Sequence, residues 1–184
     1  MKRYSLLTIA LAAALTALNA PAQSGAGEVD FSAFAHPARN GSFVDINLSH
    51  DLLSLAGRFV EKQNAEVAKL LNSVQLLRLN VIGLTDENRD VMQKTVRELR
   101  NRLDKGGWQR IVTVQKTGAE DVGIYLKLRS SDAIEGLVIS VINGQKGEAV
   151  LINLVGDIKP EQIAAVGEAL NIEPLKQAGG LIKK

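Results

Sequence analysis

The sequence contains no cysteine, only two histidines and few aromatic residues, and each shortage excludes a class of protein. Without cysteine the chain can have neither a disulfide framework nor the lipid-bearing cysteine of a lipoprotein, so a hydrophobic core must stabilise it. His36 and His50 stand alone, without the regular spacing of metal ligands, and we predict no metal site. Glycine-rich phosphate loops are also missing, and we predict no cofactor.

The first 22 residues have the features of a cleavable secretory signal. Lys2 and Arg3 form a basic start, an apolar stretch runs from Leu6 to Leu18, and Ala20-Pro21-Ala22 offers the small residues that signal peptidase requires. We therefore predict cleavage before Gln23 and a periplasmic or secreted protein that is soluble after cleavage. The alternative is a retained N-terminal anchor helix, for which the apolar stretch falls short of the ~20 residues that span a bilayer.

The charge balance changes when this leader is removed. The whole chain has 22 Lys and Arg against 20 Asp and Glu, but residues 1–22 contain two of the basic residues and no acidic one. The remaining chain is therefore electrically balanced. Because nucleic-acid binding needs a surplus of Lys and Arg on one face, we expect no nucleic-acid partner. For the same reason we expect no charge-driven binding to a membrane surface, and no transmembrane segment remains after cleavage.

Composition divides the rest of the chain into three parts. Residues 23–41 are rich in Gly, Ser and Ala without a sustained period, which predicts a flexible lead-in where Phe31 and Phe34 can pack locally. Residues 42–170 show clear periodicity and are long enough for one hydrophobic core, so we predict a single domain there. Residues 171–184 predict a frayed C-terminal tail.

Hydrophobic periodicity predicts the elements of this domain. Apolar residues recur at helical spacing after a cap at Ser49. Gln63-Asn64 interrupts this pattern, which is compatible with either one helix or two consecutive helices. Asp86-Glu87 predicts the start of another helix that Gly106 closes, and Pro160 opens the last one. Strand patterns occupy residues 44–48, 77–81, 108–115, 122–129, 134–142 and 149–155.

The resulting order of elements, β-α-α-β-α-β-β-β-β-α, is typical of an α+β domain. Short turns between the last four strands favour antiparallel neighbours. The runs Gly136 to Val141 and Val150 to Val155 are apolar on both faces, which predicts central, covered strands. We therefore expect a mixed, mostly antiparallel sheet with helices packed mainly on one face.

One surface feature suggests contact with a partner. In the strand over 122–129, Val122, Ile124, Leu126 and Leu128 alternate with the other residues and predict an inward face. Tyr125, Lys127 and Arg129 then share the outward face, where an aromatic ring and two cations suit a docking strip for a partner protein. The alternative is a solvated face whose charges discourage aggregation.

Catalytic groups are scarce. His50 lies between Ser49 and Asp51, the residue types of a hydrolase triad, but neighbours in sequence rarely point at one another and no nucleophile motif accompanies them. The acidic clusters at 86–90 and 120–121 fit a helix start and a turn better than acid–base chemistry. We therefore predict no catalytic residues.

Several segments together resemble a family of small exported bacterial proteins described only as a domain of unknown function. The segments are Gly107-Trp108, Val122 to Lys127, Gly136-Leu137-Val138 and Leu151 to Ile158. The resemblance covers residues 43–170 and implies a leader followed by this α+β fold, with no catalytic residues to carry over. The position of some members near extracytoplasmic sigma-factor and anti-sigma genes implies a setting in envelope signalling.

Three functions are compatible with these observations. The leading hypothesis is a non-catalytic, exported accessory or interaction domain that acts in envelope stress or signalling and whose partner is another envelope protein. The second is a carrier of an apolar or lipid-like ligand enclosed between sheet and helices. The third is a hydrolase that uses His50 with a carboxylate.

Overall fold

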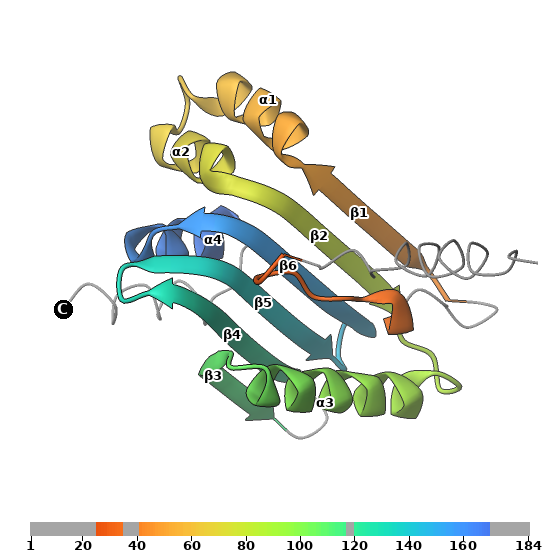
Figure 1. The fold of residues 1–184 in the computed structure, drawn as a ribbon. Helices are drawn as coiled ribbons and strands as arrows, with labels where there is room; N and C mark the ends of the chain where they lie inside the picture. Colours follow the sequence, from red (N-terminus) through yellow and green to blue (C-terminus); the bar gives the residue numbers. More distant parts are fainter. Residues whose placement is uncertain (1–24, 35–40, 117–119, 170–184) are drawn as a thin grey trace, which may run out of the picture.

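The architecture is a six-stranded antiparallel sheet with helices on both faces (Figure 1). A computed structural model describes residues 25–34, 41–116 and 120–169, so the predicted leader (1–22) and tail (171–184) lie outside the described residues. The strands are β1 (Phe43–Ser49), β2 (Val74–Gly83), β3 (Gln109–Lys116), β4 (Glu120–Ser130), β5 (Ala133–Asn143) and β6 (Glu148–Ile158). The helices are α1 (His50–Val60), α2 (Ala65–Ser73), α3 (Arg89–Lys105) and α4 (Ile163–Ala169), with short 3₁₀ turns η1 (Ser32–Phe34) and η2 (Pro160–Gln162).

The predicted α+β class and the order of elements are confirmed. The strand order is β1-β2-β6-β5-β4-β3, and each of these neighbouring pairs is antiparallel. The last four strands form a meander, as their short connections predicted. Strands β5 and β6 lie in the middle of the sheet, which explains why their sequences are apolar on both faces.

The helical stretch after β1 folds as two helices. Asn64 marks the start of the second helix, because its side chain accepts a hydrogen bond from the backbone N–H of Val67 at 3.1 Å and so caps α2. Ser49 occupies the N-cap position of α1, as predicted. The two helices lie at one end of β1 and β2 (Figure 1).

Helix α3 begins later than the sequence suggested. Asp86 and Glu87 lie in a turn, and Asn88 is the N-cap; its side chain accepts from the N–H of Thr85 and donates to the carbonyl of Gly83. These two bonds favour a tight turn over an earlier helix start. At the other end Gly106 is the C-cap of α3, as predicted, and the next residue, Gly107, has a positive φ of +75°.

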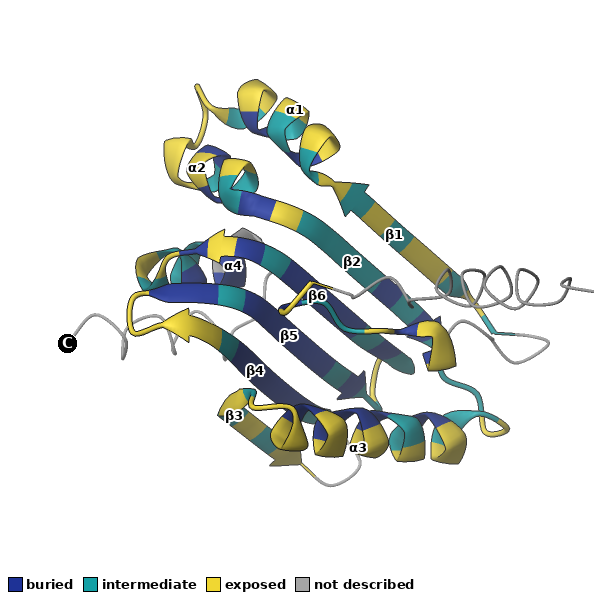
Figure 2. Ribbon diagram, viewed as in Figure 1, coloured by how far each residue is buried: buried dark blue, intermediate teal, exposed yellow. Residues whose placement is uncertain are grey.

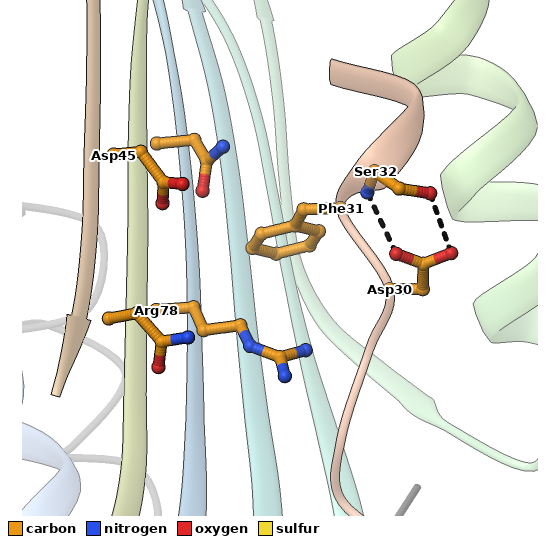
Figure 3. Close-up of a pocket in the computed structure, with 7 residues that line it drawn as sticks. Asp30, Phe31, Ser32, Asp45 and Arg78 are labelled. Atoms are coloured by element: carbon orange, nitrogen blue, oxygen red, sulfur yellow. Dashed lines mark hydrogen bonds between the residues drawn. The ribbon is translucent and has the colours of Figure 1, made fainter. Parts of the chain in front are cut away.

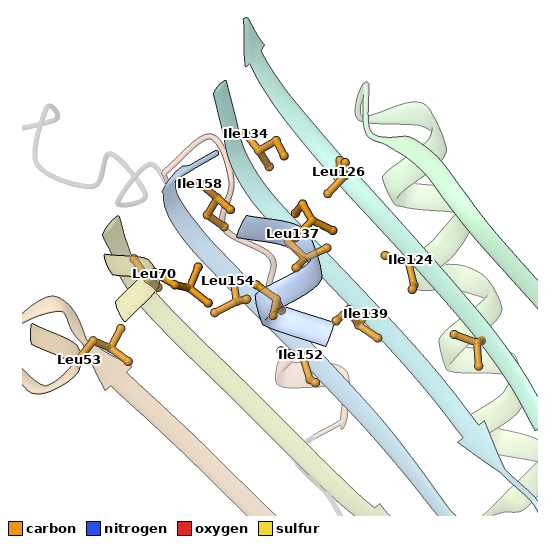
Figure 4. Packing of buried hydrophobic residues seen from close by; sticks show 14 residues of the cluster. Leu53, Leu70, Ile124, Leu126, Ile134, Leu137, Ile139, Ile152, Leu154 and Ile158 are labelled. Carbon is orange, nitrogen blue, oxygen red and sulfur yellow. The ribbon is translucent and has the colours of Figure 1, made fainter. Parts of the chain in front are cut away.

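Two hydrophobic clusters lie on opposite faces of the sheet. Helices α1, α2 and α4 contribute to the first cluster, around Ile124, Leu137 and Ile152 (Figure 4). Helix α3 covers the second, which contains Val96, Leu99, Tyr125 and Val138. Three of the four helices thus share one face, as expected, and the longest one packs on the other. Because β2 and β3 are far apart in the sheet, α3 has to cross that face to connect them.

Part of the predicted lead-in belongs to the core. The expectation of a flexible segment over 23–41 is wrong for residues 25–34, where Phe31 and Phe34 are buried in the second cluster. The buried side chain of Asn153 holds this segment: it donates to the carbonyl of Gly27 at 3.0 Å and accepts from the N–H of Val29 at 2.9 Å. A segment with few periodic residues is therefore ordered by contacts with β6.

Among the described residues, none of the helices combines the length and the apolar character that crossing a bilayer requires.

Candidate functional site

The predicted docking strip on β4 is not a continuous outward surface. The expectation that Tyr125 faces outward is wrong, because α3 packs over it and its side chain is 0% exposed. On the opposite face Val122, Ile124 and Leu126 are buried as predicted, whereas Leu128 is exposed at the end of the strand. Both faces of the middle of β4 are therefore interior, and alternation along the strand could not show this.

The phenol of Tyr125 lies in an unusual environment for a buried tyrosine. Its hydroxyl makes no hydrogen bond to any described residue. The guanidinium carbon of Arg110 lies 5.3 Å from the ring centroid, and Arg110 also forms an ion pair with Asp104. Burial raises the pKa of Tyr125 above its ordinary value, so this side chain stays protonated at neutral pH.

The other two residues of the strip have separate structural contacts. Lys127 Nζ donates to the carbonyl of Gly106 at 2.6 Å and so places its charge at the C-terminus of α3. Arg129 forms an exposed ion pair with Asp157 at 2.6 Å. A role of Lys127 and Arg129 in partner binding stays a prediction, now without the aromatic residue.

His50 bridges α1 and the start of β2. Its Nδ1 lies 2.9 Å from the carbonyl oxygen of Val74, and its Nε2 lies 3.3 Å from Ser54 Oγ. These contacts involve a carbonyl and a hydroxyl, and neither Ser49 nor Asp51 is among the hydrogen-bond partners of the ring, in line with the expectation that neighbours in sequence do not form a triad. A structural role, in which the ring of His50 links α1 to the start of β2, accounts for these contacts.

Helix α1 carries large apolar side chains on a side that no described residue covers. Its buried side consists of Leu53 and Gly57, which pack toward α2 and the sheet. Leu52 (52% exposed), Leu55 (49%) and Phe59 (74%) lie at helical spacing on another side, which we call the α1 stripe. Figure 2 shows that exposed positions occur along the length of α1. Three exposed residues of this size on one side of a helix are typical of a contact surface.

The two edge strands of the sheet differ in how they resist pairing. Edge strand β3 has Arg110 and Lys116 among its eight residues, and charged side chains discourage the addition of another strand. Edge strand β1, which leads directly into α1, has Asp45 as its single charged residue and exposes Val44. Strand β1 is therefore the less protected edge.

A polar pocket lies where residues 30–32 pass over β1 and β2. Its volume is about 240 Å³, and its seven lining residues are Asp30, Phe31, Ser32, Asp45, Asn47, Arg78 and Asn80. Figure 3 shows the ring of Phe31 projecting from the N-terminal segment toward the strands that carry Asp45 and Arg78. The strand register places Asp45 beside Asn80 and Asn47 beside Arg78, so four polar side chains form a two-by-two array.

The charged groups of the pocket are held in different ways. Asp30 accepts hydrogen bonds from the backbone N–H and the hydroxyl of Ser32, both at 2.8 Å, and these bonds lower the pKa of Asp30, helped by the more distant Arg102 and Arg78. Arg78 forms an ion pair with Glu28 and donates to the carbonyl of Val29 at 3.1 Å. Asp45 has no ion-pair partner among the described residues, so the uncompensated charge of the pocket is negative.

The comparison with family models identifies the domain. Residues 37–166 match the model described as "Domain of unknown function (DUF4252)". The chain belongs to the DUF4252 family. This confirms the resemblance to a domain of unknown function that the sequence motifs suggested. Neither a curated protein nor a solved structure matches the chain.

The DUF4252 match includes only part of the pocket. It contains β1 and β2 with Asp45, Asn47, Arg78 and Asn80, whereas Asp30, Phe31 and Ser32 precede its first residue. The family description names no activity, so the interpretation of the pocket and of the α1 stripe depends on this structure alone.

Sequence reasoning did not identify either feature. Arg78 and Asn80 alternate with apolar residues on β2, a pattern that predicted a strand and indicated no site. A second polar pair, Asp45 and Asn47, on the preceding strand was the available signal, but it becomes a pocket only when residues 30–32 pass over it. The spacing of the α1 stripe predicted a helix without indicating which side would be covered.

Proposed function

We propose that this DUF4252 protein is a non-catalytic, exported interaction domain that binds another protein at its β1–α1 edge. The observation that carries the proposal is the α1 stripe, whose three large apolar side chains are exposed together. Burial of a leucine or phenylalanine side chain contributes ~1.5–3 kcal/mol, so a partner that covers the stripe gains substantial binding energy.

The neighbouring edge strand defines the kind of partner. Because β1 is a sheet edge with one charged residue, an extended segment of a partner can add to it through backbone hydrogen bonds. A partner of this kind would carry apolar side chains that reach Val44 and the α1 stripe. We propose that it is another envelope protein, in line with the predicted signal and with a role in envelope signalling.

The alternative functions receive less support from the geometry. A carrier of an apolar ligand needs an apolar cavity, whereas the pocket over β1 and β2 is lined mainly by polar side chains. A hydrolase that uses His50 with a carboxylate needs that carboxylate in contact with the ring, and the contacts of His50 are with Val74 and Ser54. Both remain untested predictions.

Site-specific photo-crosslinking in cells that naturally express the protein tests the proposal. A photoreactive residue at Phe59 is expected to capture one defined envelope protein. The matched control is Val91, a highly exposed apolar residue on α3 (64% exposed), which is expected to capture none. Leu55→Ser should reduce capture at Phe59 by about ten-fold, since it removes roughly 1–2 kcal/mol of apolar burial.

Hydrogen exchange then distinguishes edge binding from nonspecific adhesion. In the purified complex, the amides of β1 should exchange more slowly than in the free protein, while those of β3 stay unchanged. Equal capture at Phe59 and Val91, or a complex without added protection in β1, would contradict the proposal. The intact mass of the natively produced chain checks export, because cleavage before Gln23 is expected.

A further inference from the structure

We infer that the polar pocket formed by residues 30–32, β1 and β2 binds a small, neutral carbohydrate, a single pyranose unit. This site shares β1 with the β1–α1 edge but uses side chains on one face of the strand, not its free backbone edge, and it does not depend on the proposed protein partner. It uses the face of β1 and β2 that lies under the N-terminal segment.

The first argument is the buried amide of Asn80. Its residue is only 4% exposed, yet its side chain makes no hydrogen bond to any described residue, although it lines the pocket. Its nitrogen and oxygen still reach the pocket, so a group that enters the pocket can pair with them in place of water. A ligand hydroxyl in the pocket can accept from this amide and donate to it.

The second argument is the pattern of donors and acceptors. In the two-by-two array, the Asp45 carboxylate accepts, the Arg78 guanidinium donates, and the amides of Asn47 and Asn80 do both. The side chains of Asp45 and Asn47 form no hydrogen bonds to described residues and are exposed to solvent at the pocket. Adjacent sugar hydroxyls each donate and accept, so they complement an array in which both functions alternate.

Charge narrows the class of ligand. Arg78 is already paired with Glu28, and Asp45 has no cation partner among the described side chains. The pocket therefore repels anions such as sugar phosphates or sugar acids, because it offers them no free cation. A neutral polyhydroxylated molecule satisfies the polar groups without bringing a second negative charge.

Shape and size agree with one sugar ring. The volume of about 240 Å³ is smaller than the ~300–1,000 Å³ of pockets for drug-sized ligands. The ring of Phe31, fixed edge-to-face on Phe34 with centroids 6.0 Å apart, supplies the apolar wall of the pocket (Figure 3). The C–H groups of a pyranose can pack on such a wall while its hydroxyls face the strands.

Ligand-observed NMR with the purified chain tests this inference. The probes are glucose, galactose, mannose and N-acetylglucosamine, with glucose 6-phosphate and glucosamine as charged comparisons. At least one neutral sugar is expected to bind with a dissociation constant in the millimolar range or below, and glucose 6-phosphate should bind about ten-fold more weakly. Glucosamine should bind at least as tightly as glucose, since its ammonium group meets a pocket whose uncompensated charge is negative.

Variants locate the binding in the pocket. Asp45→Ala with Asn47→Ala should weaken sugar binding about ten-fold, because it removes two hydrogen-bonding groups from exposed positions. The matched control, Asp86→Ala with Asn101→Ala, removes the same groups elsewhere on the surface and should leave binding unchanged. If the first variant has a lower Tm, Asp45→Asn replaces it, since asparagine keeps the shape of the side chain. Because this substitution removes the negative charge, it should reduce the difference in affinity between glucose and glucose 6-phosphate.

The opposite results would overturn the inference. These are no binding by any of the four neutral sugars at millimolar concentration, a preference for the phosphate over glucose, and equal binding by the pocket variant and its control. A failure here leaves the β1–α1 edge untouched, since crosslinking at Phe59 reads a different surface.

Discussion

Along β4, the side chains on one face pass from the interior to the solvent within five residues. Tyr125 is covered by α3, Lys127 reaches the C-terminus of the same helix, and Arg129 pairs with Asp157 in solvent. Helix α3 covers Tyr125 and ends near Lys127. Burial therefore falls from Tyr125 to Arg129, although the three side chains lie on the same face of β4. Of these three side chains, Tyr125 is the one whose polar group forms no hydrogen bond to a described residue.

Removal of this hydroxyl gives a prediction at the residue scale. Tyr125→Phe should leave the free energy of unfolding unchanged or raise it by up to ~1 kcal/mol, because the hydroxyl is desolvated without a partner. Urea unfolding at neutral pH measures this. A loss of more than about 1 kcal/mol would show that the hydroxyl is bonded in solution.

The same variant has a pH signature. Because burial raises the folded-state pKa of Tyr125 above the unfolded value of about 10, stability from this group is present below pH 10. It is lost as the pH rises from there through the folded pKa, because the unfolded chain ionises first. The Tyr125→Phe variant should lack this loss of stability. The free energy of unfolding of both proteins, measured as a function of pH above about pH 10, gives the difference.

At the scale of elements, α1 has two apolar sides with different surroundings. Leu53 packs into the first cluster, whereas Leu55, two residues later, is half exposed in the α1 stripe. The apolar surface of α1 is thus wider than the part that packs against the rest of the domain. Such a helix is typical of an element that also contacts a partner.

Alanine substitutions should separate these two sides. Leu53→Ala is expected to lower the free energy of unfolding by ~2–5 kcal/mol, since it leaves a cavity in the core. Leu55→Ala, its matched control in the same helix, should change it by less than ~1 kcal/mol. Thermal and urea unfolding provide the comparison; similar losses for both would mean that the α1 stripe is covered within the isolated chain.

At the scale of the whole molecule, the N-terminal segment completes one face of the sheet. Residues 25–34 lie beside α3, bury two phenylalanines and form one wall of the polar pocket. Gly27 passes so close to β5 that a Cβ there would overlap the carbonyl oxygen of Glu135. The approach explains why glycine is needed at this point.

Gly27→Ala should therefore detach the segment from the sheet. We expect a loss of ~1–3 kcal/mol of stability from the forced overlap, together with faster proteolysis near Phe31. Gly25→Ala is the control, since a Cβ at Gly25 meets no atom within 4 Å. Limited proteolysis and Tm report both effects, and identical behaviour of the two variants would show that the segment is not anchored at Gly27.

The fold was largely predictable, and the candidate sites were not. Periodicity indicated each strand and helix, and Asn-Gly and Ser-Asp turns indicated the antiparallel meander from β3 to β6. One error is local, because the side chain of Asn88 stabilises a turn and displaces the start of α3. The other lies where distant segments meet, because residues 25–34 pack on the sheet although their composition is that of a loop. The pocket residues come from three segments whose proximity no local pattern records.

The sequence by itself determined the type and order of the elements, the antiparallel connections and the membership of the core strands, because these follow from local periodicity and turn chemistry. Only the tertiary structure decided that Tyr125 is interior, that Asp45 and Asn80 line a pocket, and that no described residue covers the α1 stripe. The physical reason is that burial of a face depends on which distant segment packs over it. Alternation along a strand shows that two faces differ, while α3 and residues 25–34 decide which of them meets water.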